Sequence, residues 1–203
     1  MRRPVGRNTS ARGRGCASVP GMDPLLPFSR ERFSPMRFRE DHAVPVDHVD
    51  AMLEAARRAP SAGNSQPWRF IVGIRGDGTH ERLVRHLARS SAAWAPGAGV
   101  LIANLSQQFV EDSDLEYSEF SRYDLGQAVA HLTFQAHALG LAVHQFRAFD
   151  REAVAREFAV PSHWEVTSMA AVGQAYGPAE THTGSGTSRD RHNLADIVWL
   201  GGR

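Results

Sequence analysis

The sequence has 203 residues, 42% of them hydrophobic and 22% charged, which is typical of one globular domain that needs no disulfide or metal to hold its core. The first 21 residues hold five of the 23 basic residues, all of which are Arg, and none of the 22 acids, so residues 22–203 carry 18 Arg against 22 acids. This balance argues against nucleic-acid binding, the single Cys16 excludes a disulfide framework, and no apolar run approaches the roughly 20 residues that span a bilayer. We expect a cytoplasmic protein that binds neither nucleic acid nor membrane.

Residues 1–27 are rich in Arg, Gly, Ser and Pro and show neither a helical nor a strand period. We predict that they form a disordered N-terminal extension, or that they belong to a reading frame that starts too early, with the true start at Met22. A transit peptide would share the acid-free, Arg- and Ser-rich composition, but this segment has no amphipathic stripe. The folded domain is predicted to span residues 28–203.

The first half of the domain is predicted to alternate helices and strands. Residues 32–38 read as an extended segment that places Arg32 and Ser34 on one side. Asp47 is a plausible N-cap for an amphipathic helix that ends before Pro60. The later elements are a strand over 69–74, a turn over 76–78, a helix over 81–90 and a strand over 99–104 that is apolar on both faces.

The second half continues the same pattern. The longest helix is predicted over 121–139, with Gly140 just past its C-terminal end. The later elements are a strand over 141–146, a helix over 151–158 capped by Asp150, a strand over 166–172, a flexible Gly/Ser/Thr loop over 181–188 and a terminal strand over 194–199. This order predicts an α+β sandwich in one domain.

A polar loop, Ser61–Gln66, lies between Pro60 and Pro67, which end one helix and bar another before the next strand. Its Ser, Gly, Asn and Gln residues supply hydroxyls, carboxamides and approachable backbone N–H groups. Such a surface suits a flat ligand with polar edges, although an ordinary helix-to-strand connection has a similar composition.

Residues 107–120 carry five acids with aromatic residues between them. One interpretation is a solvated connection. The other is a mobile lid whose aromatic side chains, Phe109, Tyr117 and Phe120, face a ligand.

Several classes of chemistry find no support in the sequence. It contains neither a Gly-x-Ser-x-Gly nucleophile elbow nor a P-loop. His131, His137 and His144 lack metal-ligand spacing, so we expect no metal site. Two polar pairs remain, Arg32 with Ser34 and Arg189 with Arg191. Arg is the side chain best shaped to bind phosphate, although either pair alone could be an ordinary surface pair.

The residues at 59–70, Ala-Pro-Ser-x-x-Asn-x-Gln-Pro-Trp-x-Phe, resemble the signature of the FMN-dependent nitroreductase family. Four more motifs match this family in the right order, over about 175 residues in all. They are Arg32-Phe-Ser34-x-x-x-Phe38, Tyr123–Ala128 with its exit at Ala138–Leu141, Ala171–Gly173, and Arg189-Asp-Arg191 followed by Leu194.

The resemblance implies a three-layer α/β/α sandwich with a mixed, mainly antiparallel central sheet, assembled as an intertwined homodimer. FMN would lie in the dimer interface, with the loop Ser61–Gln66 supplied largely by the partner chain. The residues that the resemblance assigns to the cofactor are Arg32, Ser34, Pro60, Ser61, Ala62, Asn64, Gln66, Gln145, Arg147, Ala148, Arg189 and Arg191.

The resemblance also implies an oxidoreductase in which NAD(P)H reduces FMN, leaves, and is replaced by a small nitroaromatic- or quinone-like acceptor. The flavin carries the chemistry, so no catalytic side chain is assigned. Two alternatives stay open. One is a flavin-binding protein that stores FMN without efficient turnover, and the other is a specialised flavin-dependent dehalogenase or dehydrogenase of the same fold.

Two positions depart from the family pattern. Met36 stands where the phosphate motif usually has a basic residue, and the neighbouring Arg37 points elsewhere on a regular backbone. Ala148 stands where many relatives carry Gly before an aromatic–acidic pair. Losing one charge-assisted bond would weaken FMN binding by about 1–3 kcal/mol, which the Arg residues could tolerate. We therefore still expect FMN.

Overall fold

The structure of the protein is a computed structural model that describes residues 25–182 and 188–200. The chain divides into two units, Met1–Glu31 and Arg32–Arg203, and the first contains the short helix α1 (Pro27–Glu31). Most of the predicted extension, with Cys16 and Met22, lies outside the described residues, as does most of the predicted flexible loop over 181–188. Within the described ranges, no helix is long and apolar enough to cross a membrane.

A four-stranded sheet forms the centre of the second unit, in the order β1-β2-β4-β3. The strands are β1 (Trp68–Ile74), β2 (Val100–Gln107), β3 (Ala142–Phe146) and β4 (Trp164–Gly173). Every neighbouring pair is antiparallel, as the prediction of a mainly antiparallel sheet requires. The four strands predicted over 69–74, 99–104, 141–146 and 166–172 are confirmed to within a few residues at their ends.

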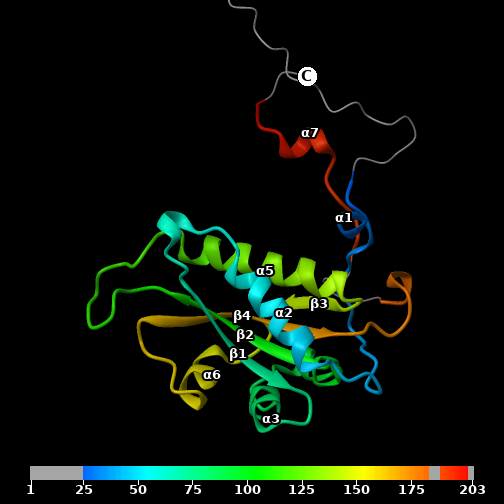
Figure 1. Cartoon of the computed structure of the whole chain (residues 1–203), viewed down its shortest axis with the longest axis horizontal. Helices are drawn as coiled ribbons and strands as arrows, with labels where there is room; N and C mark the ends of the chain where they lie inside the picture. The colour runs from blue at the N-terminus through cyan, green and yellow to red at the C-terminus, as the bar shows by residue number, and fades with distance from the viewer. Residues whose placement is uncertain (1–24, 183–187, 201–203) are drawn as a thin grey trace, which may run out of the picture. The chain divides into compact units, whose positions relative to one another are not determined.

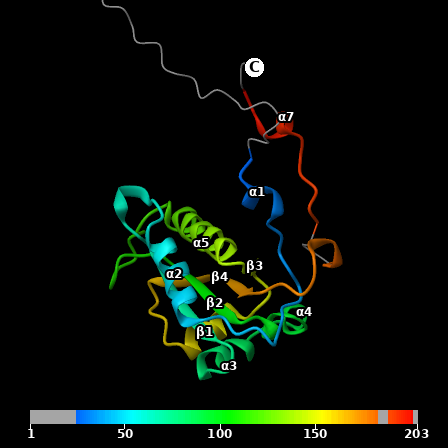
Figure 2. The ribbon, with the colours of Figure 1, turned by 45° about the vertical axis from the view of Figure 1, so that its right-hand side comes forward.

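Helices cover both faces of the sheet and complete the predicted three layers (Figure 1). One face carries α2 (Val46–Arg57) and α5 (Ser121–Ala138), and the other carries α3 (Gly78–Val84) and α6 (Arg151–Glu157). Figure 2 shows the short helix α4 (Arg89–Ala92) beside the same end of the sheet as the extended segment after residue 31. The shortest elements are three 3-10 turns, Ala62–Asn64, Ala95–Gly97 and Ala179–Thr181, and the helix α7 (Leu194–Ile197).

The sheet separates two hydrophobic cores. Ile102 points into the core with α2 and α5, whereas its neighbour Leu101 points into the core with α3 and α6. Both side chains are fully buried, as is typical of a strand covered on its two faces. The uninterrupted apolar run in the sequence of β2 therefore predicted its central position correctly.

Two glycines have clear structural reasons. A Cβ on Gly73 would lie 2.5 Å from the backbone nitrogen of His80, so only glycine lets α3 pack this closely against β1. Gly140 has a φ of 75° just after α5, which is the left-handed conformation that commonly ends a helix. The predicted end of the long helix is thus confirmed.

The predicted N-cap of α2 is wrong. Pro45 occupies the N-cap position, and no side chain caps the helix there. Asp47 lies inside the first turn, where its Oδ1 accepts a hydrogen bond from the backbone N–H of His48 at 2.9 Å. Pro45 already has the extended backbone that precedes a helix, so the helix begins at Val46, before Asp47.

The helix predicted over 81–90 is also wrong in its bounds. Asp77, assigned to a turn, caps α3 by accepting a hydrogen bond from the N–H of His80 at 2.6 Å, so the helix begins at Gly78. It ends at Val84 because Leu87 forms an isolated β-bridge with Phe149. The chain then restarts as α4 at Arg89.

The terminal strand predicted over 194–199 is a short helix, α7. Asn193 and Asp196 form a reciprocal capping box at its start, in which the Asn193 N–H donates to the Asp196 carboxylate at 3.2 Å. Within the described part of the chain this segment has no strand to pair with, and residues 188–200 are exposed throughout. Local capping therefore decides its conformation.

Candidate functional site

The loop Ser61–Gln66 has an unusual backbone. Gly63, Asn64 and Gln66 have φ values of 57°, 56° and 50°, in the left-handed region that residues other than Gly seldom adopt. Two hydrogen bonds hold the loop closed, because the Ser61 hydroxyl accepts from the Gln66 N–H at 3.0 Å and the Ser61 carbonyl accepts from the Asn64 N–H at 2.9 Å. Backbone strain of this kind costs about 1–3 kcal/mol a residue and gathers at ligand sites.

A buried carboxylate anchors the loop to the long helix. Asp124, in the first turn of α5, is 2% exposed, and its Oδ2 accepts a hydrogen bond from the backbone N–H of Ala62 at 3.0 Å. A carboxylate is also favoured at a helix N-terminus, where the helix dipole is positive. The bond therefore sets the position of the loop relative to α5.

The polar edge of the loop faces outward. Ala62 and Asn64 are exposed, and the Gln66 Nε2 donates to the Asn64 carbonyl at 3.3 Å and to its Oδ1 at 3.2 Å. The Tyr117 hydroxyl donates to the Ser65 carbonyl at 3.2 Å from the segment over 107–120. This contact places Tyr117 beside the loop, as the lid hypothesis requires, while residues 109–116 are exposed, as those of a solvated connection would be.

Three Arg side chains gather at the opposite end of the domain. Burial first, and then the positive charges of Arg191 and Arg189, lower the pKa of the Arg32 guanidinium below its ordinary value. Arg32 also donates to the Ser34 hydroxyl at 3.4 Å. The structure thus brings together the two polar pairs that lie at opposite ends of the sequence. Neighbouring guanidinium groups of this kind favour an anion between them.

The residue that departs from the family motif has a different partner. The Met36 N–H donates to the His182 Nδ1 at 3.2 Å, and the His182 ring lies 5.1 Å from the ring of Phe33. Arg37 does not take the place of the missing cation, because its guanidinium lies over the Tyr176 ring at 4.4 Å. The prediction that Arg37 points elsewhere is confirmed.

The third group of predicted residues lies at the end of β3. Gln145 is exposed, and its Nε2 donates to the Thr133 hydroxyl on α5 at 3.4 Å. The exposed Arg147 donates to the Phe149 carbonyl at 3.4 Å. Ala148 turns its carbonyl toward α4, where the backbone N–H of Ala88 donates to it at 3.0 Å.

These groups lie apart within one chain. The loop contacts Asp124 at the start of α5, and Gln145 contacts Thr133 nine residues later, or roughly 14 Å along the helix. The predicted phosphate motif lies near β3, where the Pro35 carbonyl and the His144 Nδ1 are 2.9 Å apart. Figures 1 and 2 both show the loop, in teal, and the segment after residue 31, in blue, at opposite ends of α5.

Three residues at these places, Asp124, Tyr117 and His182, are not predicted from the sequence to make these contacts. Asp124 lies in the motif Tyr123–Ala128, and its position in the first turn of a long helix is a signal that it could bind a backbone N–H. Tyr117 is one of the three aromatic residues of the segment over 107–120. For His182 the sequence holds no signal, because its contact with Met36 joins residues 146 positions apart.

Among residues 25–182 and 188–200, no three His, Cys, Asp or Glu side chains come together as a metal site would require. Several acids of the described loops and helices instead form ion pairs and helix caps. An example is Glu157, which pairs with Arg85 at 2.9 Å and also contacts Arg82.

Known proteins resemble this chain in sequence and in fold. The model of the nitroreductase family matches residues 30–93. A protein of Thermus thermophilus named NADH dehydrogenase is 30% identical over 193 residues, which covers 81% of this chain and 91% of the relative. A protein of Rhodospirillum rubrum named 5,6-dimethylbenzimidazole synthase is 27% identical over 186 residues, covering 80% and 84%.

The fold agrees as well. A solved structure described as an oxidoreductase containing FMN superposes with a TM-score of 0.79 at 26% identity, over 89% of this chain and 93% of the other. The family match, the length shared with the Thermus relative and the three-layer fold all agree, and this chain belongs to the nitroreductase family.

Proposed function

We propose that the protein is an FMN-dependent NAD(P)H oxidoreductase that reduces nitroaromatic- or quinone-like acceptors by a ping-pong mechanism. The observation that carries this proposal is the gathering of Arg32, Arg189 and Arg191 at one place on the domain. Guanidinium groups bind a phosphate ester better than any other side chain. The names of the Thermus and FMN-containing relatives support the same activity.

The residues present fit FMN. The Arg group and the Ser34 hydroxyl would hold its phosphate, and Gln145, Arg147 and Ala148 would approach its ring from β3. Pro60, Ser61, Ala62, Asn64 and Gln66 would line the ring and its ribityl chain with carboxamides, hydroxyls and exposed backbone. When bound, FMN supplies the ability to accept a hydride and pass electrons on.

The protein side chains would bind and position instead of reacting. Asp124 and Ser61 hold the loop in its strained conformation, so its donors are aligned before a ligand arrives. Tyr117 joins the lid segment to the loop and would exclude water from above it. Because the flavin would react and the protein would only bind and position it, the site needs no catalytic acid, base or nucleophile.

We further propose that the site is shared between two chains of a homodimer, because the Arg group and the loop lie at opposite ends of α5. Exposed apolar side chains support the dimer. On α5 itself, Tyr123 is 65% exposed and Phe134 is 49% exposed. On the C-terminal segment, the adjacent Trp199 and Leu200 are 101% and 93% exposed, and neighbouring apolar side chains left this exposed can mark an interaction surface.

The test is the colour of the purified protein. We expect it to be yellow with bound FMN, and NADH or NADPH to bleach it without oxygen, with colour returning when a quinone is added. A colourless protein that takes up no added FMN would contradict the proposal. Yellow protein that neither nucleotide bleaches would instead support FMN storage.

The cofactor assignment has its own test. Arg191→Ala should weaken FMN retention about 10- to 150-fold, which is the loss of one charge-assisted bond. Arg156→Ala, an equally exposed Arg on α6 away from this group, is the matched control. If both variants retain FMN equally well, the phosphate does not bind at Arg191.

A specialised activity is the second candidate, because the Rhodospirillum relative is named as a synthase and not as a reductase. Turnover separates the two candidates. A reductase should consume NAD(P)H continuously when quinones or nitroaromatics are supplied. A specialised enzyme should reduce its flavin once and pass electrons to none of these acceptors.

A further inference from the structure

A cavity of about 440 Å³ lies at the end of the sheet where β2 stops and β4 begins. None of the twelve residues assigned to FMN lines this cavity. Two aromatic residues, Phe109 and Trp164, and two Arg residues, Arg122 and Arg151, contribute to its wall. Its volume falls within the range of about 300–1,000 Å³ that is typical of small-molecule sites.

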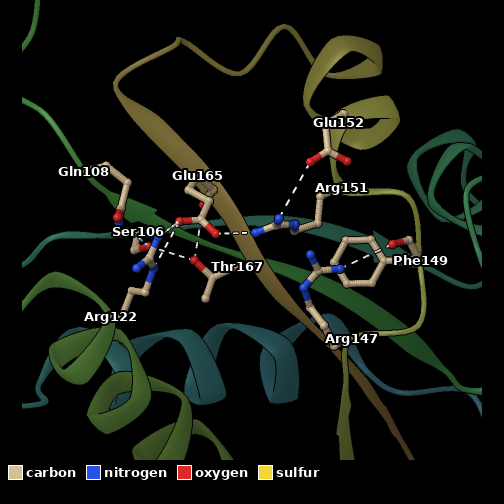
Figure 3. A network of polar contacts seen from close by, with 9 residues as sticks. All are labelled: Ser106, Gln108, Arg122, Arg147, Phe149, Arg151, Glu152, Glu165 and Thr167. Carbon is tan, nitrogen blue, oxygen red and sulfur yellow. Dashed lines mark hydrogen bonds and ion pairs between the residues drawn. The ribbon is translucent and has the colours of Figure 1, made fainter. Parts of the chain in front are cut away.

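The polar side of the cavity is built around Glu165. Arg122, from the first turn of α5, donates to Glu165 Oε2 through Nη2 at 2.5 Å and through Nε at 3.1 Å. Arg151, the first residue of α6, donates through Nη1 to Glu165 Oε1. Figure 3 shows the two guanidinium groups approaching the carboxylate from opposite sides.

The end of β3 makes room for this arrangement. β3 pairs with β4 only from Met169 to Gly173, so within residues 25–182 and 188–200 the segment Trp164–Ser168 has no strand beside it on that edge. Arg151 crosses this uncovered edge to reach Glu165. The cavity therefore exists because β3 is shorter than β4. Its two Arg residues come from different helices.

The hydrogen-bond partners of the Arg and Glu side chains indicate which kind of ligand the cavity would bind. The Glu165 carboxylate accepts bonds from both Arg residues, so its charge and lone pairs are largely satisfied. The Arg151 Nε is buried and has no hydrogen-bond partner among the described residues, whereas the bonds of Arg122 use its Nε and Nη2 but not its Nη1. The second acid, Glu152, has a side chain that is 69% exposed and forms an ion pair with the Arg151 Nη2 at 3.7 Å. The Arg122 side chain is 64% exposed, so its Nη1 remains a donor that an acceptor-rich anion can use.

The aromatic residues favour a flat ring. The guanidinium of Arg69 lies 5.0 Å from the centre of the Trp164 ring, and Arg69 lines a neighbouring hollow that does not include Arg122 or Arg151. Trp164 therefore separates two hollows and offers part of its surface to the cavity described here. Phe109 comes from the lid segment. Stacking of a base on an aromatic side chain is worth about 1–3 kcal/mol.

The cavity also lies within reach of the loop that would line the flavin. Glu165 on β4 pairs with Ser106 on β2, and Ser106 pairs with Trp68 on β1. Trp68 directly follows the loop and Pro67. Two strand spacings separate Glu165 from Trp68, or about 10 Å. One extended dinucleotide could therefore place one end in the cavity and the other beside the loop.

We propose that this cavity binds the adenylate half of NAD(P)H, with the adenine against Trp164 and a phosphate at Arg122 and Arg151. The inference rests on the proposed function, because it names where the remote end of that co-substrate docks. A free adenine nucleotide carries the same base and phosphate as the adenylate half of NAD(P)H. Competition with NAD(P)H decides which of these two ligands the cavity binds.

The probe is adenosine 2′,5′-bisphosphate added to the FMN-loaded protein, with binding followed by calorimetry and by Trp fluorescence. We expect binding, and inhibition that is competitive against NADPH but not against the quinone acceptor. Arg122→Gln should weaken bisphosphate binding and raise the KM for NADPH about 10-fold or more, as loss of a charge-assisted bond does. The kcat and the KM for the quinone should change less than about twofold, because Arg122 would bind NADPH equally in the ground state and the transition state.

Arg156→Gln is the matched control, since it removes the same charge from an exposed position on α6 and should change none of these quantities. The double variant Arg122→Gln with Glu165→Gln removes both partners of one pair, so it leaves no unpaired carboxylate if the single variant folds poorly. It should show the same loss of binding. Equal affinity in Arg122→Gln and Arg156→Gln would overturn the inference.

Two further outcomes would also overturn it. One is the absence of bisphosphate binding at millimolar concentration, and the other is binding that does not compete with NADPH. A protein that retains no FMN would instead contradict the proposed function. The calorimetry still runs on such a protein, because none of the cavity residues belongs to the flavin group, so the two failures are distinguishable.

Discussion

At the scale of single residues, Asp124 shows how the fold prepares the loop. It is buried, and its bond to the Ala62 N–H is the contact that ties the loop to α5. We predict that Asp124→Ala lowers the free energy of unfolding by about 1–3 kcal/mol, because a charged hydrogen bond and its buried partner are lost. Urea denaturation monitored by fluorescence measures this change.

The same variant should retain less FMN at a concentration where it is fully folded. Asp114→Ala, an exposed Asp in the segment over 107–120, is the control and should change neither stability nor retention. Unchanged FMN retention in Asp124→Ala would show that the loop position does not depend on this bond.

His144 predicts a pH dependence of stability. Burial lowers its pKa below the ordinary value of 6.5, and the bond to the Pro35 carbonyl only partly opposes this. Just below pH 6.5, the unfolded chain therefore binds a proton at His144 more readily than the folded chain does. Stability should be full above pH 6.5 and should fall as the pH drops below it, at no more than about 1.4 kcal/mol per pH unit for one proton.

His144→Gln should flatten this slope between about pH 6.5 and 5.5, where few carboxylates titrate. The buried His80 has a pKa lowered by the same cause and will contribute a slope of its own. His192→Gln removes an exposed His and should leave the slope unchanged. Equal slopes in the His144 variant and the unaltered protein would contradict the assignment.

Residue-scale prediction from sequence succeeded where residues are close along the chain. The polar loop between Pro60 and Pro67 follows from its own composition, and Asp150 caps α6 by accepting from the Ala153 N–H at 2.9 Å, as expected. The contact between Met36 and His182 needed the folded chain. The same holds for the cavity around Glu165, whose two Arg partners belong to different helices.

At the scale of elements, the C-terminal segment tests the dimer. Trp199 and Leu200 are 101% and 93% exposed, so replacing them with Ser should barely change the stability of an isolated chain. We predict that Trp199→Ser with Leu200→Ser weakens the dimer at least about 10-fold, because burying two large apolar side chains contributes roughly 3–6 kcal/mol. Sedimentation at a series of concentrations measures this.

Val46→Ser is the control, since Val46 is 62% exposed in the first turn of α2, away from the C-terminal segment in sequence. It should leave the dimer as tight as in the unaltered protein. A double variant that dimerises equally well would show that the C-terminal segment does not cover the second chain.

The elements that sequence predicted well are those with a long, regular pattern. β2 and α5 are recognisable from uninterrupted apolar character and from helical spacing ended by Gly140. The failures have physical causes of another kind. The helix over 81–90 is interrupted by the bridge between Leu87 and Phe149, and the terminal strand became a helix because it lacks a neighbouring strand among the described residues. Both depend on distant parts of the chain.

At the scale of the whole molecule, the central claim is that one flavin site needs two chains. The Arg group contains Arg32 and Arg191, and the loop contains Ala62 and Asn64. Each group is well formed, yet α5 separates them in a single chain. A two-fold dimer repeats every such contact, so it would bring the Arg group of each chain to the loop of the other.

The most direct measurement is the FMN content of a mixed dimer. One chain carries Arg32→Ala with Arg191→Ala, the other carries Ala62→Glu with Asn64→Glu, and two different tags isolate the mixed dimer after co-expression. Each variant alone should form a colourless homodimer. We predict that the mixed dimer retains one FMN, because one intact Arg group then meets one intact loop. A mixed dimer without FMN would contradict the shared site, since a site within one chain would be defective in both.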